Sequence, residues 1–150
     1  MINEVCQNSK DFLTEVVSDL RFDLQLTSKV TTEGCLLNLE GDDSFLLLNE
    51  SGELLDAFEV LLFQVFGRDI DRNERIICDA EGFRQTRRAE LQAMARFAAQ
   101  NVRKSGKPFK FGKLNSTERR LIHLTLANES DLISESVGEG RDRQLQIKLK

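Results

Sequence analysis

The chain has 150 residues, 40% of them hydrophobic and 31% charged, with a formal net charge of −4. This is the length and balance of one globular domain or of two very small ones, and it excludes a disordered chain. No segment approaches about 18 uncharged apolar residues, and the N-terminus lacks a basic region followed by an apolar run. Neither a membrane span nor a secretory signal is therefore expected, and the cytoplasm is the expected location.

The first half of the chain predicts the element order α-β-β-α-α-β. These helices and strands are expected over residues 9–20, 22–26, 34–39, 44–48, 53–66 and 75–80. Apolar side chains recur at helical spacing after Ser9, which we take as the cap of the first helix. Gly67 is the natural end of the strongly apolar helix before it. About 80 residues are enough for one small core.

The second half predicts a long helix, a short strand, a second helix and an antiparallel pair of strands, over residues 82–104, 108–111, 116–128, 132–137 and 144–149. Asn115 or Ser116 caps the second helix, with Glu118 reaching back as in a capping box. Phe109 and Phe111 alternate with lysines, so we expect both rings in the core. The fold class is therefore α+β, with a three-stranded sheet in the second half.

Charge is divided unevenly between the two halves. Residues 1–75 hold 6 basic and 16 acidic side chains, a net charge of −10, whereas residues 76–150 hold 15 basic and 9 acidic ones, a net charge of +6. Within residues 84–120 there are 11 basic and 2 acidic side chains. Such asymmetry favours a polyanionic partner for the basic half, and the alternative is that the two halves attract each other.

The three cysteines, Cys6, Cys35 and Cys78, are odd in number, far apart and without a CxxC motif. We expect them to be reduced and buried rather than to form a disulfide or a zinc site. A single histidine, with no tryptophan or tyrosine, argues against a metal centre and against a Ser-His-Asp site. Neither a dinucleotide fingerprint nor a P-loop occurs, so no enzymatic activity and no cofactor are expected.

Four segments carry a recognisable pattern: NLEGDDSFLLLNESGELLDAFEVLLFQV in the first half, DAEGFRQTRRAEL at the junction, and ERRLIHLTL and SESVGEGRDRQLQI in the second half. Together they resemble the Jag (SpoIIIJ-associated) family of bacterial RNA-binding proteins. That family joins a KH domain to an R-3-H domain, named for an arginine, three residues and a histidine. The resemblance implies a type II KH-like domain over residues 1–80 and a single-stranded nucleic-acid-binding R-3-H domain over residues 81–150.

Arg119 and His123 are the expected centre of the nucleic-acid site. Their spacing of four places both on one face of the helix from Ser116, opposite an apolar stripe that includes Ile122. A guanidinium binds phosphate, and an imidazole donates to phosphate or stacks on a base. The remaining candidates are basic residues near this face or, for the last two, in the loop that matches the family's basic loop: Arg120, Lys107, Lys110, Lys113, Arg141 and Arg143.

The KH half departs from the family pattern at its GxxG loop, which here is Asn49, Glu50, Ser51 and Gly52. Asn49 can take a left-handed conformation in place of glycine, but Glu50 repels phosphate where the family usually has a basic residue. We therefore expect the KH half to be structural or to make protein contacts, in a homodimer or with a small KH-domain protein.

Two questions stay open at this point. Three arginines at the start of the long helix meet either nucleic acid or the acidic first half: Arg84, Arg87 and Arg88. The chain as a whole binds single-stranded RNA or single-stranded DNA or, as the alternative, is a protein-interaction adaptor with no direct nucleic-acid role. Salt separates these two functions, because binding through several phosphates weakens steeply as ionic strength rises.

Overall fold

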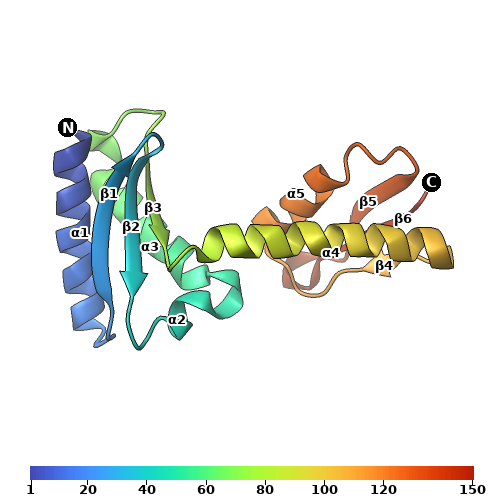
Figure 1. Ribbon diagram of the computed structural model, residues 1–150, viewed down its shortest axis with the longest axis horizontal. Helices are drawn as coiled ribbons and strands as arrows, with labels where there is room; N and C mark the ends of the chain where they lie inside the picture. The colour runs from blue at the N-terminus through green and yellow to red at the C-terminus, as the bar shows by residue number, and fades with distance from the viewer. The chain divides into compact units, whose positions relative to one another are not determined.

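A computed structural model describes residues 1–150 of the chain, with the side chain of Arg141 left out of the description. The chain forms two compact units, Met1–Arg84 (unit 1) and Gln85–Lys150 (unit 2). The division follows Arg84, four residues after the boundary that the sequence predicts. Each unit combines helices with a small sheet, so the predicted α+β class is confirmed (Figure 1). Among the described residues, no helix combines the length and the apolar character that crossing a membrane requires.

Unit 1 contains three longer strands and two longer helices. In chain order its elements are α1 (Ile2–Asp19), β1 (Gln25–Thr31), β2 (Gly34–Glu40), α2 (Phe45–Leu48), α3 (Glu53–Phe66) and β3 (Arg75–Asp79), with short 3-10 turns at Asn49–Ser51 and Gly67–Asp69. The sheet has the order β1-β2-β3, in which β1 and β2 are antiparallel and β2 and β3 are parallel. Leu37 of β2 lies opposite Cys78 of β3.

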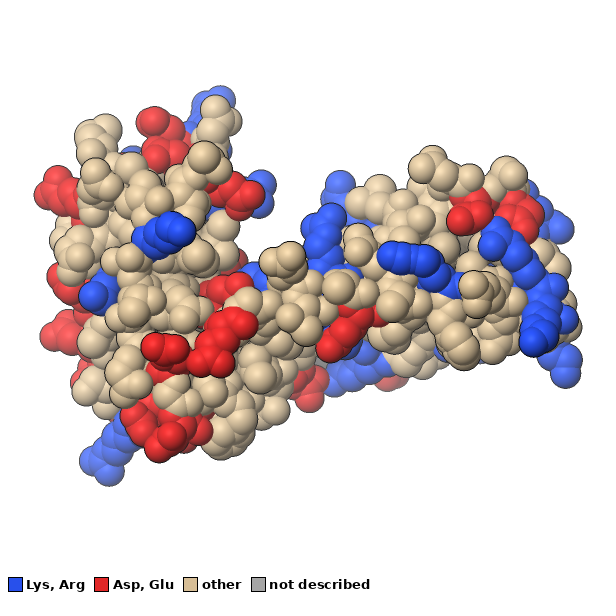
Figure 2. Space-filling view, in the orientation of Figure 1, with Lys and Arg blue, Asp and Glu red and all other residues tan. Residues whose placement is uncertain are grey.

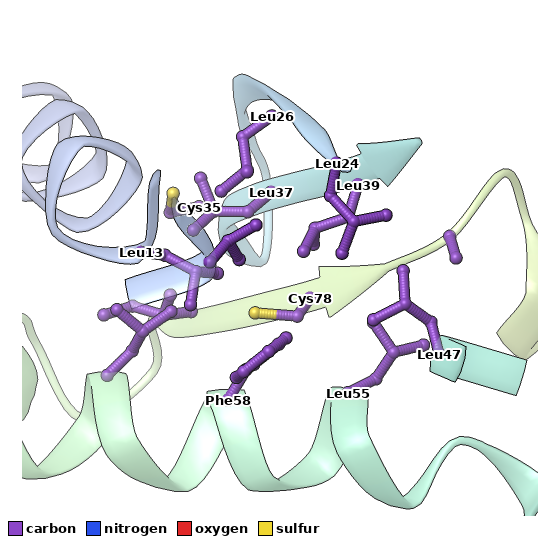
Figure 3. Packing of buried hydrophobic residues seen from close by; sticks show 14 of the residues in the cluster. Leu13, Leu24, Leu26, Cys35, Leu37, Leu39, Leu47, Leu55, Phe58 and Cys78 are labelled. Carbon is purple, nitrogen blue, oxygen red and sulfur yellow. The ribbon is translucent and has the colours of Figure 1, made fainter. Parts of the chain in front are cut away.

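The core of unit 1 lies on one face of this sheet. Leu37 and Cys78 are fully buried and lie in the same cluster as Leu13 of α1 and Leu55 of α3 (Figure 3). Alternate residues of β2 are therefore directed at the helices, as the period-two pattern predicts. Burial raises the pKa of the Cys78 thiol to about 12.

The first helix begins seven residues earlier than predicted. Ser9 is not its cap: it lies in the middle of α1, fully buried, and its hydroxyl has no hydrogen-bond partner among the described residues. Ile2, Val5 and Cys6 continue the stripe of Leu13 towards the N-terminus at helical spacing. A single polar residue interrupts that stripe, and interpreting it as a cap hid the first two turns of the helix.

The prediction that all three cysteines are reduced is wrong for two of them. Cys6 and Cys35 form a disulfide, with their Cα atoms 5.3 Å apart, and Cys78 is a free, buried thiol. Helix α1 packs across β1 and β2, which brings together two residues 29 positions apart in the sequence. Neither a large sequence distance nor the lack of a CxxC motif excludes such a contact, because the fold determines which cysteines lie close together.

We expect the native protein, purified without reductant, to show no reactive thiol at about pH 8. The Cys78 thiol is buried and protonated at that pH, since its pKa is raised to about 12. Alkylation followed by mass spectrometry should find no label in the native state, one in denaturant and three after reduction in denaturant. Three labels in denaturant without reduction would contradict the disulfide.

Unit 2 is built on α4 (Phe83–Ser105), which begins at the last two residues of unit 1. The other elements are β4 (Phe109–Lys110), α5 (Ser116–Thr125), β5 (Leu132–Val137), a 3-10 turn (Gly140–Asp142) and β6 (Gln144–Leu149). The strands form an antiparallel sheet with the order β4-β6-β5, so the predicted three-stranded sheet is present. The bounds of β5 and β6 are those predicted, whereas α5 ends three residues early.

The core of unit 2 lies between its sheet and its two helices. Small side chains on α4, among them Ala95 and Ala98, are fully buried and leave room for the larger Ile122 of α5 and Ile147 of β6. Phe111 is 2% exposed, and Phe109 packs against the same cluster, so the predicted role of both rings in packing is confirmed.

Candidate nucleic-acid interface

The helix that carries the arginine and the histidine is held by a complete capping box. The Asn115 side chain accepts a hydrogen bond from the Glu118 N–H at 2.8 Å, and Glu118 Oε1 accepts one from the Asn115 N–H at 3.1 Å. The other oxygen, Oε2, accepts from Nε of Arg87 on α4 at 2.7 Å. Glu118 is only 5% exposed, so it fixes the first turn of α5 against α4 from inside the unit.

Arg119 uses much of its guanidinium within the protein. Nη1 donates to the carbonyl oxygens of Leu114 and Arg143, at 3.0 and 3.3 Å, and Nη2 donates to the Ser116 hydroxyl at 3.1 Å. The side chain is half-buried. It joins the loop before α5 to the residue that precedes β6. Arg119 therefore shapes this surface and keeps only part of its hydrogen-bonding capacity for a ligand.

His123 lies one turn further along the same face of α5. Its ring is exposed, and Nδ1 is hydrogen-bonded to the hydroxyl of Ser134 on β5. The second ring nitrogen, Nε2, points away from Nδ1 and can bind another partner. When the serine donates to Nδ1, Nε2 carries the proton and is a donor towards solvent. Arg119 and His123 thus both contact the β5–β6 hairpin, and the predicted shared face is present.

Ser134 is a site residue that the sequence reasoning missed. It pairs with Ile147 across the strands and therefore lies on the core-facing side of β5, together with Leu132. A hydroxyl at a position where the alternation demands an apolar residue is the signal that was available. An unpaired hydroxyl on the buried face of a strand costs free energy, so a polar partner is to be expected, and here it is His123.

The structure does not bring all the predicted basic residues to this face. Lys110 pairs with Gln146, whereas its neighbour Phe109 pairs with Ile147 of the core, so Lys110 lies on the face of the sheet away from α5. The lysine was expected near this face as one of three lysines that bracket the strand. Because the two phenylalanines face the core and α5, strand alternation turns Lys110 to the other side of the sheet. Four of the other candidates have exposed side chains: Lys107, Lys113, Arg120 and Arg143. Arg141 is a candidate whose side chain lies outside the described residues.

The three arginines at the start of α4 differ in the groups that they contact. Arg84 lies in unit 1 and forms ion pairs with Asp56 at 2.9 Å and Glu59 at 2.8 Å, so it meets the acidic half. Burial opposes the charge of Arg84, but the two carboxylates outweigh burial and raise its pKa. Burial also raises the pKa of Glu59, against the pull of the Cys78 N–H and of Arg84. Arg87 pairs with Glu118 inside unit 2, and Arg88 is exposed.

The loop in the GxxG position takes a conformation that differs from the expected one. Asn49 is extended, and the left-handed residues are Glu50, Ser51 and Gly52, with φ of 52°, 59° and 83°. A Cβ added to Gly52 would lie 2.8 Å from the Phe83 ring, so this glycine serves both the turn and a close contact. Two non-glycine residues in left-handed geometry mark a strained segment.

A surface ion-pair network holds the far end of α4. Arg103 binds Asp131 through Nε at 2.7 Å and Glu129 through Nη2 at 2.7 Å, and so connects α4 to the segment between α5 and β5. The Arg103 guanidinium holds the pKa of Asp131 below its ordinary value. Among the described side chains, no group of three or more histidines, cysteines or carboxylates is placed to hold a metal ion.

The Asp131 ion pair predicts a small loss of stability of unit 2 in acid. A carboxyl whose folded-state pKa is lowered stabilises the fold above its ordinary pKa of 3.8, and this contribution disappears as pH falls through the lower folded-state value. We expect wild type to lose more stability than Asp131→Asn between about pH 5 and about pH 2.5. Urea unfolding followed by circular dichroism measures this, and equal losses would contradict it.

Comparison with known proteins identifies the class of the second unit. Residues 89–149 match the family model of the R-3-H domain, so this part of the chain is the domain expected from the sequence. The chain is also similar to proteins named RNA-binding protein KhpB. It is 28% identical to that of Clostridium symbiosum over 142 residues, 93% of this chain and 64% of the relative. It is 27% identical to that of Bacillus subtilis (strain 168) over 146 residues, 96% of this chain and 70% of the relative.

A third relative, RNA-binding protein KhpB of Lactiplantibacillus plantarum, is 28% identical over 132 residues, which cover 88% of this chain and 40% of the relative. The chain thus spans less than two thirds of the length of the Clostridium protein and of the Lactiplantibacillus protein. These comparisons confirm the resemblance to the Jag family, and the family model rests on the R-3-H half alone.

Proposed function

We propose that this chain binds single-stranded nucleic acid, with RNA as its main ligand, through the R-3-H unit. The observation that carries the proposal is the exposed His123, held by Ser134 on the face of α5 that it shares with Arg119. Unit 2 holds 14 basic and 7 acidic side chains, a net charge of +7. Figure 2 shows acidic side chains gathered over unit 1 and many of the basic ones over unit 2. The relatives named RNA-binding protein support the same ligand.

The residues of this face take different parts in binding. His123 donates from Nε2 to a phosphate oxygen or stacks on a base. Arg143, Arg120 and Lys113 supply positive charge for phosphates, with Lys107 nearby in sequence. Arg119 holds the backbone of Arg143 in place and offers its remaining donors. The family resemblance implies that Arg141 and Arg143 belong to a basic loop, which would close over the bound nucleic acid.

Unit 1 is proposed to be a KH-like domain with a degenerate loop that supports the protein or binds another one. The acidic Glu50 in this loop opposes phosphate. Val60 and Phe63 on α3 are 60% and 65% exposed, an unusual exposure for such side chains and one that favours a protein contact, with a second copy or a small KH-domain protein. We propose no enzymatic activity and a cytoplasmic location, where thiols would act on the Cys6–Cys35 bond.

The proposal is tested by fluorescence anisotropy with a short single-stranded RNA. Each phosphate contact contributes about 0.7 to the slope of log affinity against log salt, so several contacts lower affinity at least about tenfold when salt rises about fourfold. Absence of binding at low salt would favour the adaptor. Binding that is insensitive to salt would contradict the proposed phosphate contacts.

Arg143→Ala is the sharpest variant for the site, because it removes the guanidinium and leaves the carbonyl that Arg119 binds. Loss of one charge-assisted bond of about 1.5–3 kcal/mol predicts at least tenfold weaker binding. His123→Ala should cost less, since it removes a ring with fewer hydrogen-bond donors than a guanidinium. Arg72→Ala removes the same charge from unit 1 and should have little effect. Equal effects of Arg143→Ala and Arg72→Ala would refute the site.

Glu50→Lys tests the part played by the KH loop. Replacing an acidic by a basic side chain should strengthen RNA binding or leave it unchanged, because the loop either gains an attraction to phosphate or does not take part. The same titration measures this, with circular dichroism as the folding control. A marked weakening in a folded variant would mean that Glu50 itself serves in binding.

A further inference from the structure

A hollow of unit 2 lies along the last turns of α4. Its volume is about 330 Å³, and it is lined by Phe97, Gln100, Asn101, Lys104 and Ser105. Phe97 is 61% exposed, although α4 buries its other face completely at Ala95, Ala98 and Val102. None of these lining residues belongs to the face of Arg119 and His123.

The geometry of the helix explains why these side chains gather. Phe97, Asn101 and Lys104 follow one another at intervals of four and three, so they form one exposed stripe on α4. The Phe97 ring meets Phe109 of β4 edge to face, with centroids 6.4 Å apart and planes at 83°. That contact orients the ring, while most of its surface stays open to solvent.

The chemistry of the hollow is that of a platform for one base. An aromatic ring stacks on any base, and the amides of Gln100 and Asn101 each offer a donor and an acceptor to a base edge. Lys104 places a positive charge beside them, where the phosphate of a flanking nucleotide would lie. Phe97 is the sole apolar side chain among the lining residues, so the hollow lacks the extended apolar surface that an amphipathic helix would need.

We infer that this hollow is a second nucleic-acid subsite, in which one base stacks on Phe97, the amides of Gln100 and Asn101 contact its edge, and Lys104 binds a neighbouring phosphate. The inference rests on the proposed binding of single-stranded nucleic acid by unit 2. It places the subsite beside β4, whereas His123 contacts Ser134 of β5, and these are the two edge strands of the sheet. One strand of nucleic acid would therefore span the width of the unit.

The test compares a single-stranded RNA of about 12 nucleotides with an oligonucleotide of the same length whose backbone carries no bases. Phe97→Leu removes the ring and keeps an apolar side chain, and Phe97→Tyr keeps the ring. We expect Phe97→Leu to weaken RNA binding at least about fivefold, the lower end of a base-stacking contribution, and Phe97→Tyr to bind within about twofold of wild type. Neither change should alter binding of the base-free strand.

Phe45→Leu is the matched control, since it makes the same substitution at a ring of similar exposure in unit 1 and should leave RNA affinity unchanged. Lys104→Gln gives a second, independent measurement: it should lower the salt slope by about 0.7, the value for one phosphate contact on a single strand. Circular dichroism verifies that each variant is folded.

The outcomes separate this inference from the proposed function. If wild type binds neither strand at low salt, the proposed function fails. If wild type binds RNA with a steep salt dependence and Phe97→Leu binds equally well, the subsite is overturned and the proposed function stands. Two other results would also overturn the subsite and indicate a protein contact of the ring. In one, Phe97→Leu weakens binding of the RNA and of the base-free oligonucleotide equally; in the other, it changes the mass of the protein measured by sedimentation.

Discussion

Glu118→Ala is expected to lower the free energy of unfolding of unit 2 by about 2–4 kcal/mol. The substitution removes the acceptor of the Asn115 N–H in the capping box and leaves Arg87 without its strongest partner. Glu118 is 5% exposed, so the carboxylate of this ion pair is shielded from solvent. Arg87 is about a quarter exposed and can be rehydrated, which keeps the cost below that of a fully buried charge left alone.

Glu118→Gln separates the two contributions. Glutamine preserves the capping box and removes the charge that faces Arg87, so its cost should lie between those of wild type and Glu118→Ala. Hydrogen exchange of α5 amides in the full chain, detected by mass spectrometry, measures the change within unit 2. A loss below about 1 kcal/mol for Glu118→Ala would show that the pair contributes little. Because α5 carries His123, RNA affinity should fall with the same variants.

Local signals in the sequence were enough where they act over a few residues. The capping box predicted at Asn115 and Glu118 is present, because both partners lie within one turn. The hairpin of β5 and β6 has its predicted bounds, since alternation at Leu145 and Ile147 persists to the ends of the strand. The start of α1 was missed because the apolar stripe continues through a buried Ser9, and only packing against β1 and β2 shows that this position is internal.

The sequence predicts the helix that carries the site residues, but it does not predict the groups to which these residues are hydrogen-bonded. The spacing of Arg119 and His123 is sufficient to place them on one face. The hydrogen bond from Arg119 to the Arg143 carbonyl depends on how the chain folds back over 24 residues. The placement of Lys110 on the other face of the sheet depends on the register of β4 with β6. Hydrogen bonds to backbone carbonyls leave no trace in residue identity, so a charged side chain that looks free in the sequence is partly committed in the fold.

The disulfide is the largest difference between the sequence prediction and the structure, and it leads to the prediction with the largest effect. Reduction of Cys6–Cys35 is expected to lower the free energy of unfolding of unit 1 by about 3–4 kcal/mol. The bond closes a loop with a sequence separation of 29, and in the chain-entropy account the cost grows with the logarithm of that length. Without the bond, the early turns of α1 keep only the packing of residues such as Val5 against the sheet.

Urea unfolding with and without a phosphine reductant tests this prediction, followed by far-ultraviolet circular dichroism. The midpoint of wild type should fall on reduction, and Cys6→Ser should unfold at the lower midpoint in both conditions. Cys78→Ala is the matched control, because it removes a sulfur from the same core without touching the cross-link, so its midpoint should still depend on reductant. A wild-type midpoint that ignores the reductant would show that the bond contributes nothing to unit 1. In a reducing compartment, the expected loss would lower the stability of unit 1 and leave the proposed RNA-binding face of unit 2 intact.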